Sequence, residues 1–238
     1  MLQPTEIERA LVITAHPDDV DFGAAGTVAT LTDAGVQVTY CLVTDGDAGG
    51  FDLTIPRPQM AEMRRVEQTR AAKEVGVESL IFLGHGDGRV VADLTLRRDL
   101  SRVIRQVRPT VVVAQSPVRD LSRIYASHPD HLAAGEAAIA AVYPDSRNPF
   151  AYPELIDEGL PAWTVPQMWL MGPSPTSVFV DVTDQVDRKI RALMCHETQH
   201  TDPDGTASRV RAWMQATATQ FGLAEGRSAE TFQVVDTR

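Results

Sequence analysis

The stretch that most constrains this chain is LVITAHPDDVDFGAAG, at residues 11–26. Its first four residues, 11–14, are apolar and mostly β-branched, which is typical of a buried strand. His16, Asp18 and Asp19 follow at once, and the small residues after them can open a helix. In an open α/β sheet, functional side chains collect at the carboxyl ends of strands. We therefore expect these three side chains to lie at such a strand end.

The residue types in this turn favour a metal site. Zinc accepts imidazole nitrogen and carboxylate oxygen together as ligands. Pro17 fixes its own φ and pushes His16 towards extended geometry, which makes the turn stiff. A stiff turn can aim His16 and Asp19 at one point and leave Asp18 beside it. Because a catalytic zinc site needs three protein ligands and an open position, a third ligand must come from elsewhere in the chain.

A second His-Pro-Asp element supplies candidates for that ligand. Residues 127–135 read SHPDHLAAG, follow an apolar run at 110–114 and precede a helical pattern. Two such elements at two strand ends can converge across a sheet, although spacing alone does not decide between His128 and His131 as the ligand. Taken alone, Asp130 would be an ordinary helix N-cap. The metal hypothesis therefore depends on the two elements together.

At these residues the chain resembles the zinc-dependent N-deacetylases of the LmbE-like (PIG-L) family. The resemblance rests on the motifs AHPDD and HPDH and extends from residue 11 to residue 199. It implies that zinc is bound by one group of side chains and that another does the chemistry. The implied ligands are His16, Asp19 and His131; Asp18 is the implied general base, His128 stabilises the tetrahedral oxyanion, and Asp130 favours the charged form of His128.

Softer family motifs imply a set of substrate-binding residues. The family has Arg-x-x-Glu where this chain has Arg64 and Glu67, and Leu-Gly-x-x-Asp where Asp87 stands, so Arg64 and Asp87 are expected to bind the sugar. Asp47 stands in a glycine-rich loop where the family has the longer glutamate. Tyr125 precedes the second histidine element, near a family tyrosine that helps to polarise the carbonyl. From the residues alone, the arginine and glutamate would form a surface ion pair, and Asp87 would be a turn residue.

Three further residues have roles that the sequence leaves open. His85 lies among glycines beside Asp87 and is an alternative ligand. Cys195 precedes His196, but one Cys-His pair is weak evidence for a metal site. In the family a His-x-Ser-Gln pattern stands at this point, and we interpret His196 as a supporting or structural residue.

Composition excludes several classes of protein. A chain of 238 residues predicts a single domain, residues 1–238, with a substantial core. A net charge of −10 argues against nucleic acid or an anionic membrane surface as a partner. Two cysteines are too few for a disulfide framework, and neither a signal peptide nor a transmembrane run is apparent. We expect a cytoplasmic protein with a small-molecule substrate, and the resemblance leaves room for a homo-oligomer.

The order of the patterns predicts an α/β fold, Rossmann-like and in three layers, with a mostly parallel sheet of the LmbE-like type. The expected strands are residues 9–14, 37–43, 79–83, 110–114, 167–171, 177–181 and 230–235. The expected helices are residues 22–34, 58–75, 94–107, 130–142, 184–194 and 207–221. Two irregular segments, 44–58 and 143–166, are predicted to face the substrate, because long loops in compact domains are usually functional.

These expectations converge on a zinc-dependent hydrolase that removes an N-acetyl group from an amino sugar or glycoconjugate. Fe²⁺ or Co²⁺ can also occupy a site of this ligand type. One alternative keeps the metal chemistry but cleaves another amide, such as that of a mycothiol conjugate. A second alternative is a non-catalytic nucleotide-binding module, which rests on GAAG at residues 23–26 opening a helix. That motif is only GxxG, and the second strand ends without a well-placed acid to hold a ribose.

Overall fold

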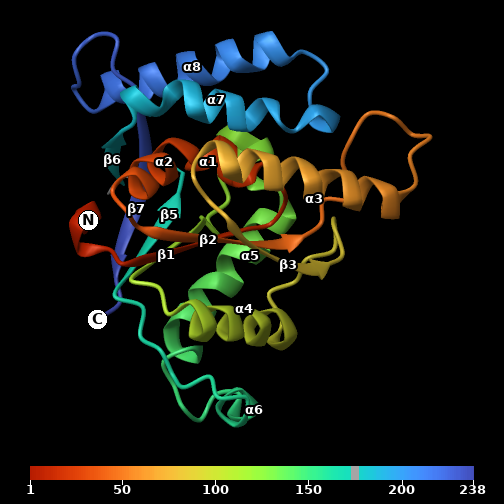
Figure 1. Ribbon diagram of the computed structural model, residues 1–238, viewed down its shortest axis with the longest axis vertical. Coiled ribbons are helices and arrows are strands. Elements are labelled where there is room, and N and C mark those ends of the chain that lie inside the picture. Colours follow the sequence, from red (N-terminus) through yellow and green to blue (C-terminus); the bar gives the residue numbers. More distant parts are fainter. Residues whose placement is uncertain (173–176) are drawn as a thin grey trace.

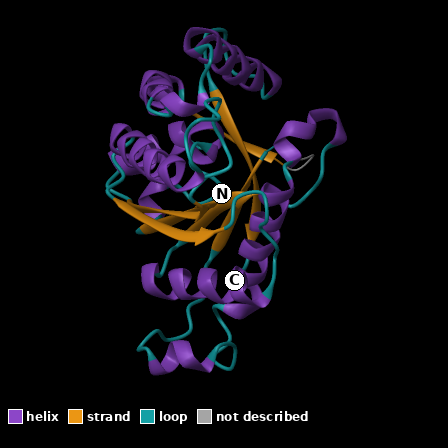
Figure 2. Ribbon diagram, turned by 90° about the vertical axis from the view of Figure 1, so that its right-hand side faces the viewer, coloured by secondary structure: helices purple, strands orange, loops and turns teal. Residues whose placement is uncertain are grey.

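The computed structural model describes residues 1–172 and 177–238, with helices on both faces of a central sheet (Figures 1 and 2). The strand order is β3-β2-β1-β4-β5-β7-β6. Neighbours from β3 to β5 pair in parallel, and β7 is antiparallel to both of its neighbours, which confirms the mostly parallel α/β fold. The strands are β1 (Arg9–Thr14), β2 (Gln37–Thr44), β3 (Ser79–His85), β4 (Val111–Gln115), β5 (Gln167–Met171), β6 (Ser177–Asp181) and β7 (Ala229–Asp236).

The helices form a layer on each side of this sheet. In Figure 1, α1, α2, α3 and α7 lie above the sheet with α8 beyond them, and α4 lies below it with α6 at the bottom. The helix α5 passes behind the sheet in this view and packs on the same face as α4. The α-helices are α1 (Asp19–Gly23), α2 (Ala25–Asp33), α3 (Arg57–Glu74), α4 (Leu94–Val107), α5 (Pro129–Ala140), α6 (Pro153–Asp157), α7 (Val186–Met194) and α8 (Pro203–Gln220). Shorter helical turns are η1 (Pro4–Glu6), η2 (Leu121–Ser127), η3 (Ala141–Asp145), η4 (Thr183–Gln185) and η5 (Glu197–Gln199).

Alternation along the central strands divides the core in two. Ala10 and Val12 of β1 pack among buried residues of α2, α3 and α7. Leu11 and Ile13 point to the other face and pack among residues of α4 and α5. Because both faces of a parallel sheet are covered, its strands are mostly apolar, as in β4, which is buried along its whole length. This rigid double-faced core fixes the strand ends from which the site is built.

The first helix begins earlier than the sequence pattern predicts. A single helix over residues 22–34 was expected, but two helices span this region and Ala24, at φ −147°, separates them. The first, α1, begins at Asp19, directly after the carboxylate pair. The close approach of Gly23 to Met171 and of Gly26 to Val182 leaves no space for a Cβ at either glycine. Tight packing therefore explains the small residues of this stretch.

The segment 143–166 lies on the side of the molecule away from the strand carboxyl ends. Arg105 of α4 donates to the backbone carbonyls of Asp145 and Ser146, and the Trp163 indole donates to Pro109 O, just before β4 begins. The prediction that this segment faces the substrate is therefore wrong. Its irregular backbone is held instead by a buried arginine.

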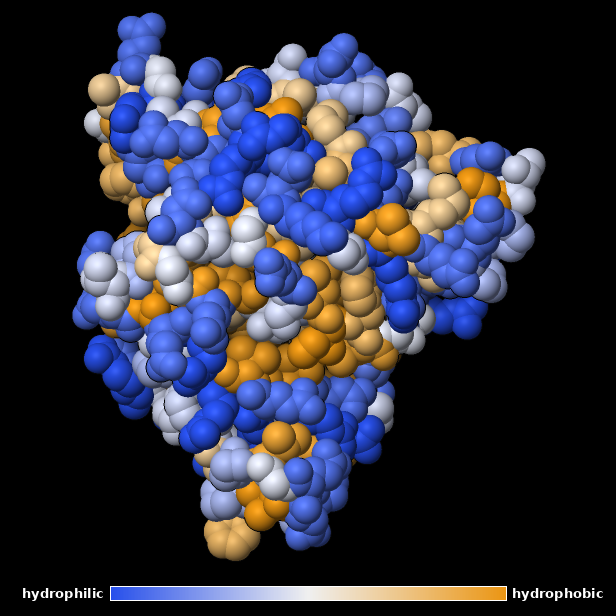
Figure 3. All heavy atoms as spheres, viewed as in Figure 1, coloured by the Kyte–Doolittle hydropathy of each residue, from blue (hydrophilic) through white to orange (hydrophobic). Residues whose placement is uncertain are grey.

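The face shown in Figure 3 has an apolar area in its middle, between α3 and α4. There β3 is the edge strand, and its apolar side chains from Leu80 to Leu83 are only half-buried. Among the helices of the described residues, none combines the length and the apolar character that crossing a membrane requires.

Candidate metal centre and cavity

The site is built where neighbouring strands end. His16, Asp18 and Asp19 follow β1, and His128 and His131 lie at the start of α5, which follows β4. The strands β1 and β4 are neighbours at the point where the strand order reverses, which is the usual ligand position in such sheets. The ring of His16 lies 5.1 Å from that of His128 and 5.2 Å from that of His131, centroid to centroid. The two sequence elements therefore converge, as the sequence predicted.

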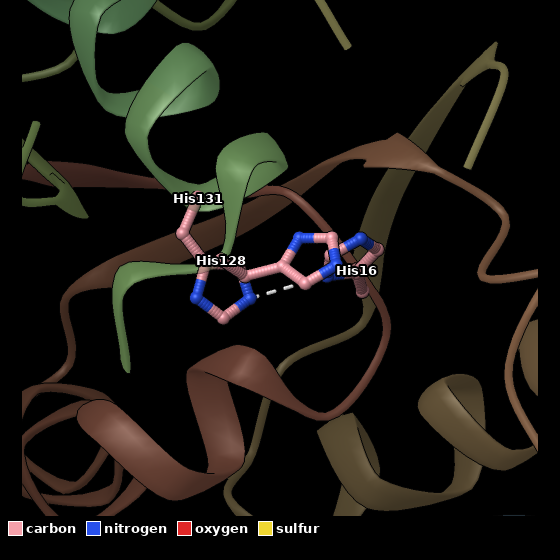
Figure 4. A group of neighbouring side chains, drawn as sticks. All are labelled: His16, His128 and His131. Atoms are coloured by element: carbon pink, nitrogen blue, oxygen red, sulfur yellow. Dashed lines mark hydrogen bonds between the residues drawn. The ribbon is translucent and has the colours of Figure 1, made fainter. Parts of the chain in front are cut away.

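Three of these side chains aim ligand atoms at a common point. His16 Nδ1 lies 3.2 Å from His131 Nε2 (Figure 4). It also lies 3.3 Å from one oxygen of Asp19. The other Asp19 oxygen lies 3.0 Å from His131 Nε2. Such separations match those between ligands of a tetrahedral ion with bonds of about 2.0–2.1 Å. The expected ligand set of His16, Asp19 and His131 thus has a geometry that fits a metal.

The remaining ring nitrogens are held so that the lone pairs face the site. His16 Nε2 lies 3.2 Å from carboxylate oxygens of both Asp87 and Asp130, so this nitrogen carries the proton and Nδ1 is free to bind. His131 Nδ1 lies 3.4 Å from the carbonyl of Ala126, which leaves Nε2 free. Metal-binding histidines are commonly oriented in this way.

Two other groupings of ligand atoms lie within 4.8 Å of one another, one with His128 in place of Asp19 and one of His16 with Asp87 and Asp130. In the first, Nε2 is the one nitrogen of His128 that a metal could bind, and in the second the Asp130 oxygens are already hydrogen-bonded. The Nδ1 atom of His128 accepts from the Asp130 N–H at 3.2 Å. The carboxylate of Asp130 accepts from the N–H groups of Gly88 and Val90 at 2.7 and 3.2 Å. In the set with Asp19, the His16 N–H donates to Asp19 Oδ2 at 2.8 Å, while the other Asp19 oxygen faces His131 Nε2 at 3.0 Å.

Asp130 makes contacts that the sequence did not predict. We expected it to favour the charged form of His128, but its carboxylate bonds to His16 and to two backbone N–H groups. Burial and the neighbouring histidines lower the pKa of His128, and Asp130 offsets this only in part. His128 itself caps α5 through Nδ1, so the neutral ring keeps its proton on Nε2. His128 is exposed and lines the cavity, where Nε2–H is available as a donor.

Asp18 is held in a strained conformation beside the ligands. Its φ is 87°, a left-handed geometry that costs a non-glycine residue about 1–3 kcal/mol. Its N–H donates to Gln68 Oε1 at 2.8 Å, and its carboxylate lies 3.1 Å from Arg64 Nη2. Burial raises the pKa of Asp18, and the Arg64 guanidinium acts in the opposite direction. Strain of this kind clusters at functional sites, because the surrounding structure must enforce it.

Arg64 bonds to the chain itself. Besides the Asp18 carboxylate it donates to Pro17 O and Gly46 O, at 2.5 and 3.0 Å, and its side chain is almost inaccessible. A Cβ at Gly46 or Gly49 would collide with the guanidinium. These contacts tie the loop after β2 to the turn that carries the candidate base, and they explain why the loop needs glycines. Arg64 still reaches the cavity wall.

Glu67, the other half of the Arg-x-x-Glu motif, is also buried rather than part of a surface ion pair. It accepts from the Thr198 N–H and hydroxyl at 2.8 and 2.7 Å. The motif on α3 therefore fastens two separate segments to the site.

The other expected substrate-binding residues fall in different places. Asp87 is buried, lines the cavity and accepts a hydrogen bond from the Ala48 N–H at 2.8 Å. Burial raises the pKa of Asp87, but the hydrogen bonds from His16 and Ala48 outweigh burial and bring this pKa to about 2. Asp47 lies outside the cavity lining and forms a bidentate pair with Arg57 at 2.8 and 2.9 Å. Tyr125 is exposed on η2 at the cavity rim. Of the three, Asp87 is the one that contacts a candidate ligand.

A cavity of about 1430 Å³ opens over these residues. One wall of the cavity is a face of α8. The sequence predicts this helix from the spacing of its side chains, but it does not predict that the helix lines the cavity. The α8 residues that line the cavity are Thr206, Arg209, Val210 and Trp213. The loop after β2 contributes Ala48 and Gly49, whereas residues 143–166 contribute nothing to the lining.

The three residues with open roles contact partners other than the proposed metal ligands. His85 pairs with Asp99 of α4 at 3.2 Å, which gives this histidine a partner other than a metal. His196 is fully buried and lies 2.9 Å from Asp21. Cys195 is half-buried and its thiol points back to the Arg191 carbonyl. The interpretation of His196 as a supporting or structural residue stays a prediction at this point.

The electrostatics of the centre suit a cation. Burial lowers the pKa of His16, but Asp19 and Asp87 act against burial and raise it to about 11. Despite burial, the two histidines also hold the pKa of Asp19 well below its usual range. Carboxylates thus surround His16, and the centre requires a compensating positive charge. A divalent cation fits this requirement and the donor set.

The helix that a nucleotide phosphate would need is already occupied. The carboxylate of Glu230 accepts from the N–H groups of Gly26 and Thr27 at 3.0 and 2.7 Å, at the start of α2. Lys189 pairs with it at 2.6 Å, and both side chains are essentially inaccessible. A phosphate would have to displace a buried ion pair, so this helix start does not serve as the anion site of a nucleotide-binding module.

Comparisons with known proteins agree with this site. The PIG-L family model, described as GlcNAc-PI de-N-acetylase, matches residues 11–142, more than half of the chain. The diacetylchitobiose deacetylase of Thermococcus kodakarensis is 31% identical over 97% of this chain and 84% of that protein. A probable N-acetyl-α-D-glucosaminyl L-malate deacetylase 2 of Bacillus subtilis is 31% identical over 81% of this chain and 83% of that protein. The solved N,N'-diacetylchitobiose deacetylase of Pyrococcus horikoshii has a TM-score of 0.89 at 28% identity, covering 98% of this chain and 85% of that one.

Proposed function

Because this chain belongs to the PIG-L family and is a deacetylase, we propose that it uses a zinc ion to remove the acetyl group from an N-acetylated glucosamine that carries a further group. The observation that carries the proposal is the convergence of His16, Asp19 and His131, with the strained Asp18 beside them. Fe²⁺ or Co²⁺ would suit the same nitrogen and oxygen ligands.

In this proposal His16, Asp19 and His131 hold the cation. When bound, a divalent ion at such a site lowers the pKa of a water ligand and polarises a carbonyl. Asp87 and Asp130 orient His16 for this role, because each accepts a hydrogen bond from its distal nitrogen.

Asp18 is the proposed general base. It adjoins a ligand, its carboxylate lines the cavity, and burial raises its pKa towards the range in which a base is effective. It takes a proton from the attacking water and then gives that proton to the departing amine nitrogen. Arg64, 3.1 Å away, fixes the carboxylate but leaves its second oxygen for this exchange.

His128 is the proposed oxyanion donor. Its Nδ1 is committed to the Asp130 N–H, so the neutral ring presents Nε2–H to the cavity. A donor that is already oriented stabilises negative charge on the carbonyl oxygen as the carbonyl carbon becomes tetrahedral. This role needs no charged imidazole, which agrees with the lowered pKa of His128.

The size of the cavity supports a conjugated sugar as substrate. At about 1430 Å³ it exceeds the ~300–1,000 Å³ typical of small-molecule pockets. Asp87 lies at the metal end, and the α8 wall with Arg209 and Trp213 forms another part of the lining. We propose that the acetamido sugar binds at Asp87 and that the second group lies along α8, where Trp213 can stack on a ring. The substrates in the names of the relatives, diacetylchitobiose and N-acetylglucosaminyl malate, both have such a second group.

Release of free amine from a substrate series tests this proposal. N-Acetylglucosamine, diacetylchitobiose, N-acetylglucosaminyl malate and N-acetylglucosaminyl inositol would be compared with the zinc-loaded enzyme. We expect kcat/KM to be higher for the conjugates than for the monosaccharide, and Trp213→Ala to remove most of that difference. Equal rates for all four, unaffected by Trp213→Ala, would contradict the proposed α8 subsite. Amine release from none of them, with zinc bound, would favour the alternative of another amide.

A further inference from the structure

Three buried polar side chains form a hydrogen-bonded chain that ends at Asp18. His196 Nε2 lies 2.9 Å from Asp21 Oδ2, and Gln68 Nε2 donates to the same oxygen at 2.9 Å. Gln68 Oε1 accepts from the Asp18 N–H at 2.8 Å. We call His196, Asp21 and Gln68 the buried triplet; each of its members is 0% exposed.

The direction of every bond in the triplet is fixed. A carboxylate can only accept, so His196 and Gln68 must both donate to Asp21. The amide nitrogen of Gln68 is thereby committed to Asp21, and its oxygen is the atom that faces the Asp18 N–H. If the Gln68 amide were turned by half a turn, its nitrogen would face the Asp18 N–H and its oxygen would face the Asp21 carboxylate, so neither hydrogen bond would form. Gln68 is therefore locked from behind, and it presents an acceptor to the backbone of Asp18.

The triplet and Arg64 hold Asp18 from two sides. Gln68 and Arg64 are four residues apart on α3 and therefore project from one face of that helix. Arg64 bonds to Pro17 O and to the Asp18 carboxylate, while Gln68 bonds to the Asp18 N–H. Between these two side chains the backbone at Asp18 has its left-handed φ of 87°. A backbone held away from its preferred region needs such external contacts.

Two atoms of the triplet lack partners, which argues against a purely stabilising role. Asp21 Oδ1 and His196 Nδ1 are buried and have no hydrogen bond to any of the described residues. Apolar side chains of similar volume would stabilise a core at least as well as an incompletely paired polar group. The Glu230–Lys189 pair is different, because Glu230 also satisfies the start of α2.

We propose that Gln68 is a positioning residue for Asp18, and that Asp21 and His196 act through it by locking its amide. The proposal rests on the function proposed above, in which Asp18 is the general base. None of the three triplet residues contacts the substrate; they set where the Asp18 carboxylate points.

The decisive variant is Gln68→Met, which keeps the length and most of the volume of the side chain and removes both hydrogen bonds. We expect kcat to fall by about tenfold to a hundredfold, because a displacement of about 1 Å at a reacting group has effects of that size. KM and the amount of bound metal should stay within about twofold of the wild-type values, because Gln68 contacts none of the proposed ligands. His196→Gln should lower kcat in the same direction and by less.

A double-mutant cycle separates positioning from general destabilisation. In an Asp18→Asn background, Gln68→Met should cause no further loss of residual activity, because its effect passes through the carboxylate. The matched control is Thr27→Val, which removes the buried hydrogen bond from the Thr27 hydroxyl to Glu230, outside the buried triplet, and should leave kcat unchanged. The proposal is overturned if Gln68→Met leaves kcat unchanged, if it lowers activity equally in both backgrounds, or if Thr27→Val lowers kcat as much.

Hydrogen exchange gives a readout that does not depend on turnover. In the metal-loaded protein, the peptide containing residues 15–22 should exchange faster in Gln68→Met than in the wild type or in Thr27→Val. If the peptide exchanges faster in Gln68→Met but the wild-type protein releases amine from none of the substrates, the positioning contact is retained and the proposed function is rejected. Unchanged exchange would reject the positioning role itself.

Discussion

The substitution Asp130→Asn distinguishes two roles for this buried carboxylate. Asp130 receives three hydrogen bonds: from His16 Nε2 and Gly88 N on one oxygen, and from Val90 N on the other. Asparagine has the same shape but only one oxygen. Whichever way its amide is turned, at least one of these donors faces an NH₂ group. If Asp130 orients His16, the metal centre must therefore weaken.

The structure sets the expected size of the effect. Loss of a group that orients a metal-binding histidine lowers metal affinity by about 10–100-fold, which is about 1.4–2.8 kcal/mol of binding free energy. The buried donor left without a partner should also lower the free energy of unfolding by about 1–3 kcal/mol. The assay is zinc titration in competition with a chelator, together with urea denaturation of the metal-free protein.

The matched control is Asp145→Asn. Asp145 is also buried and pairs with Arg97 at two distances of 2.9 Å, but it lies on the other side of the molecule. Asp145→Asn should lower the free energy of unfolding and leave zinc affinity unchanged. If Asp130→Asn lowers kcat while zinc affinity stays within about threefold of wild type, the orienting role is refuted and Asp130 acts through His128 after all.

Three further predictions concern charge and metal. Burial lowers the pKa of His16, but Asp19 and Asp87 raise it to about 11 in the metal-free chain, so a bound cation must displace a proton. Apparent zinc affinity should therefore rise with pH, by about tenfold per pH unit for each proton released. Calorimetry in two buffers of different ionisation enthalpy would count those protons. A zinc affinity that does not depend on pH between 6 and 8 would contradict this prediction. Glu230→Gln should lower the free energy of unfolding, measured by urea denaturation, by about 3–5 kcal/mol, because it leaves the buried Lys189 charge unpaired. Adding Lys189→Met should restore part of this stability. If the losses caused by the two substitutions simply add, the Glu230–Lys189 ion pair does not have this role. Zinc at about 1,000 times its Kd should stabilise the folded chain by about 4 kcal/mol, seen as a rise in Tm that a chelator reverses; an unchanged Tm would contradict a folded-state site.

The sequence was sufficient to predict the fold and the convergence of the two histidine elements. Each element follows an apolar run, and parallel strands end at the same edge of a sheet, so His16 and His131 had to approach if the two strands were neighbours. The roles of His128 and His131 could be separated only by resemblance, because both lie at the start of one helix. The structure adds the physical difference: His128 caps that helix through Nδ1, whereas His131 leaves Nε2 free.

Other features depend on tertiary packing that no local pattern records. The resemblance pairs Asp130 with His128, and no local pattern indicates that Asp130 also bonds to His16, 114 positions away. The length and irregular pattern of segment 143–166 predict that it faces the substrate, but a buried Arg105 holds its carbonyls away from the cavity. The face of α8 that lines the cavity had a readable spacing, but nothing in the sequence indicated which side of that helix faces the metal centre. Gln68 carried no signal, because an isolated glutamine on a helix usually faces solvent.

The most direct test of the central claim compares bound metal and amine release in three proteins: wild type, Asp18→Asn and His131→Ala. Zinc content would be measured after gel filtration, and turnover with diacetylchitobiose and N-acetylglucosaminyl inositol. We predict that Asp18→Asn retains zinc and loses turnover by about a hundredfold or more, as expected for a general base, while His131→Ala loses both. Zinc and turnover retained in His131→Ala, or near wild-type turnover in Asp18→Asn, would contradict the account.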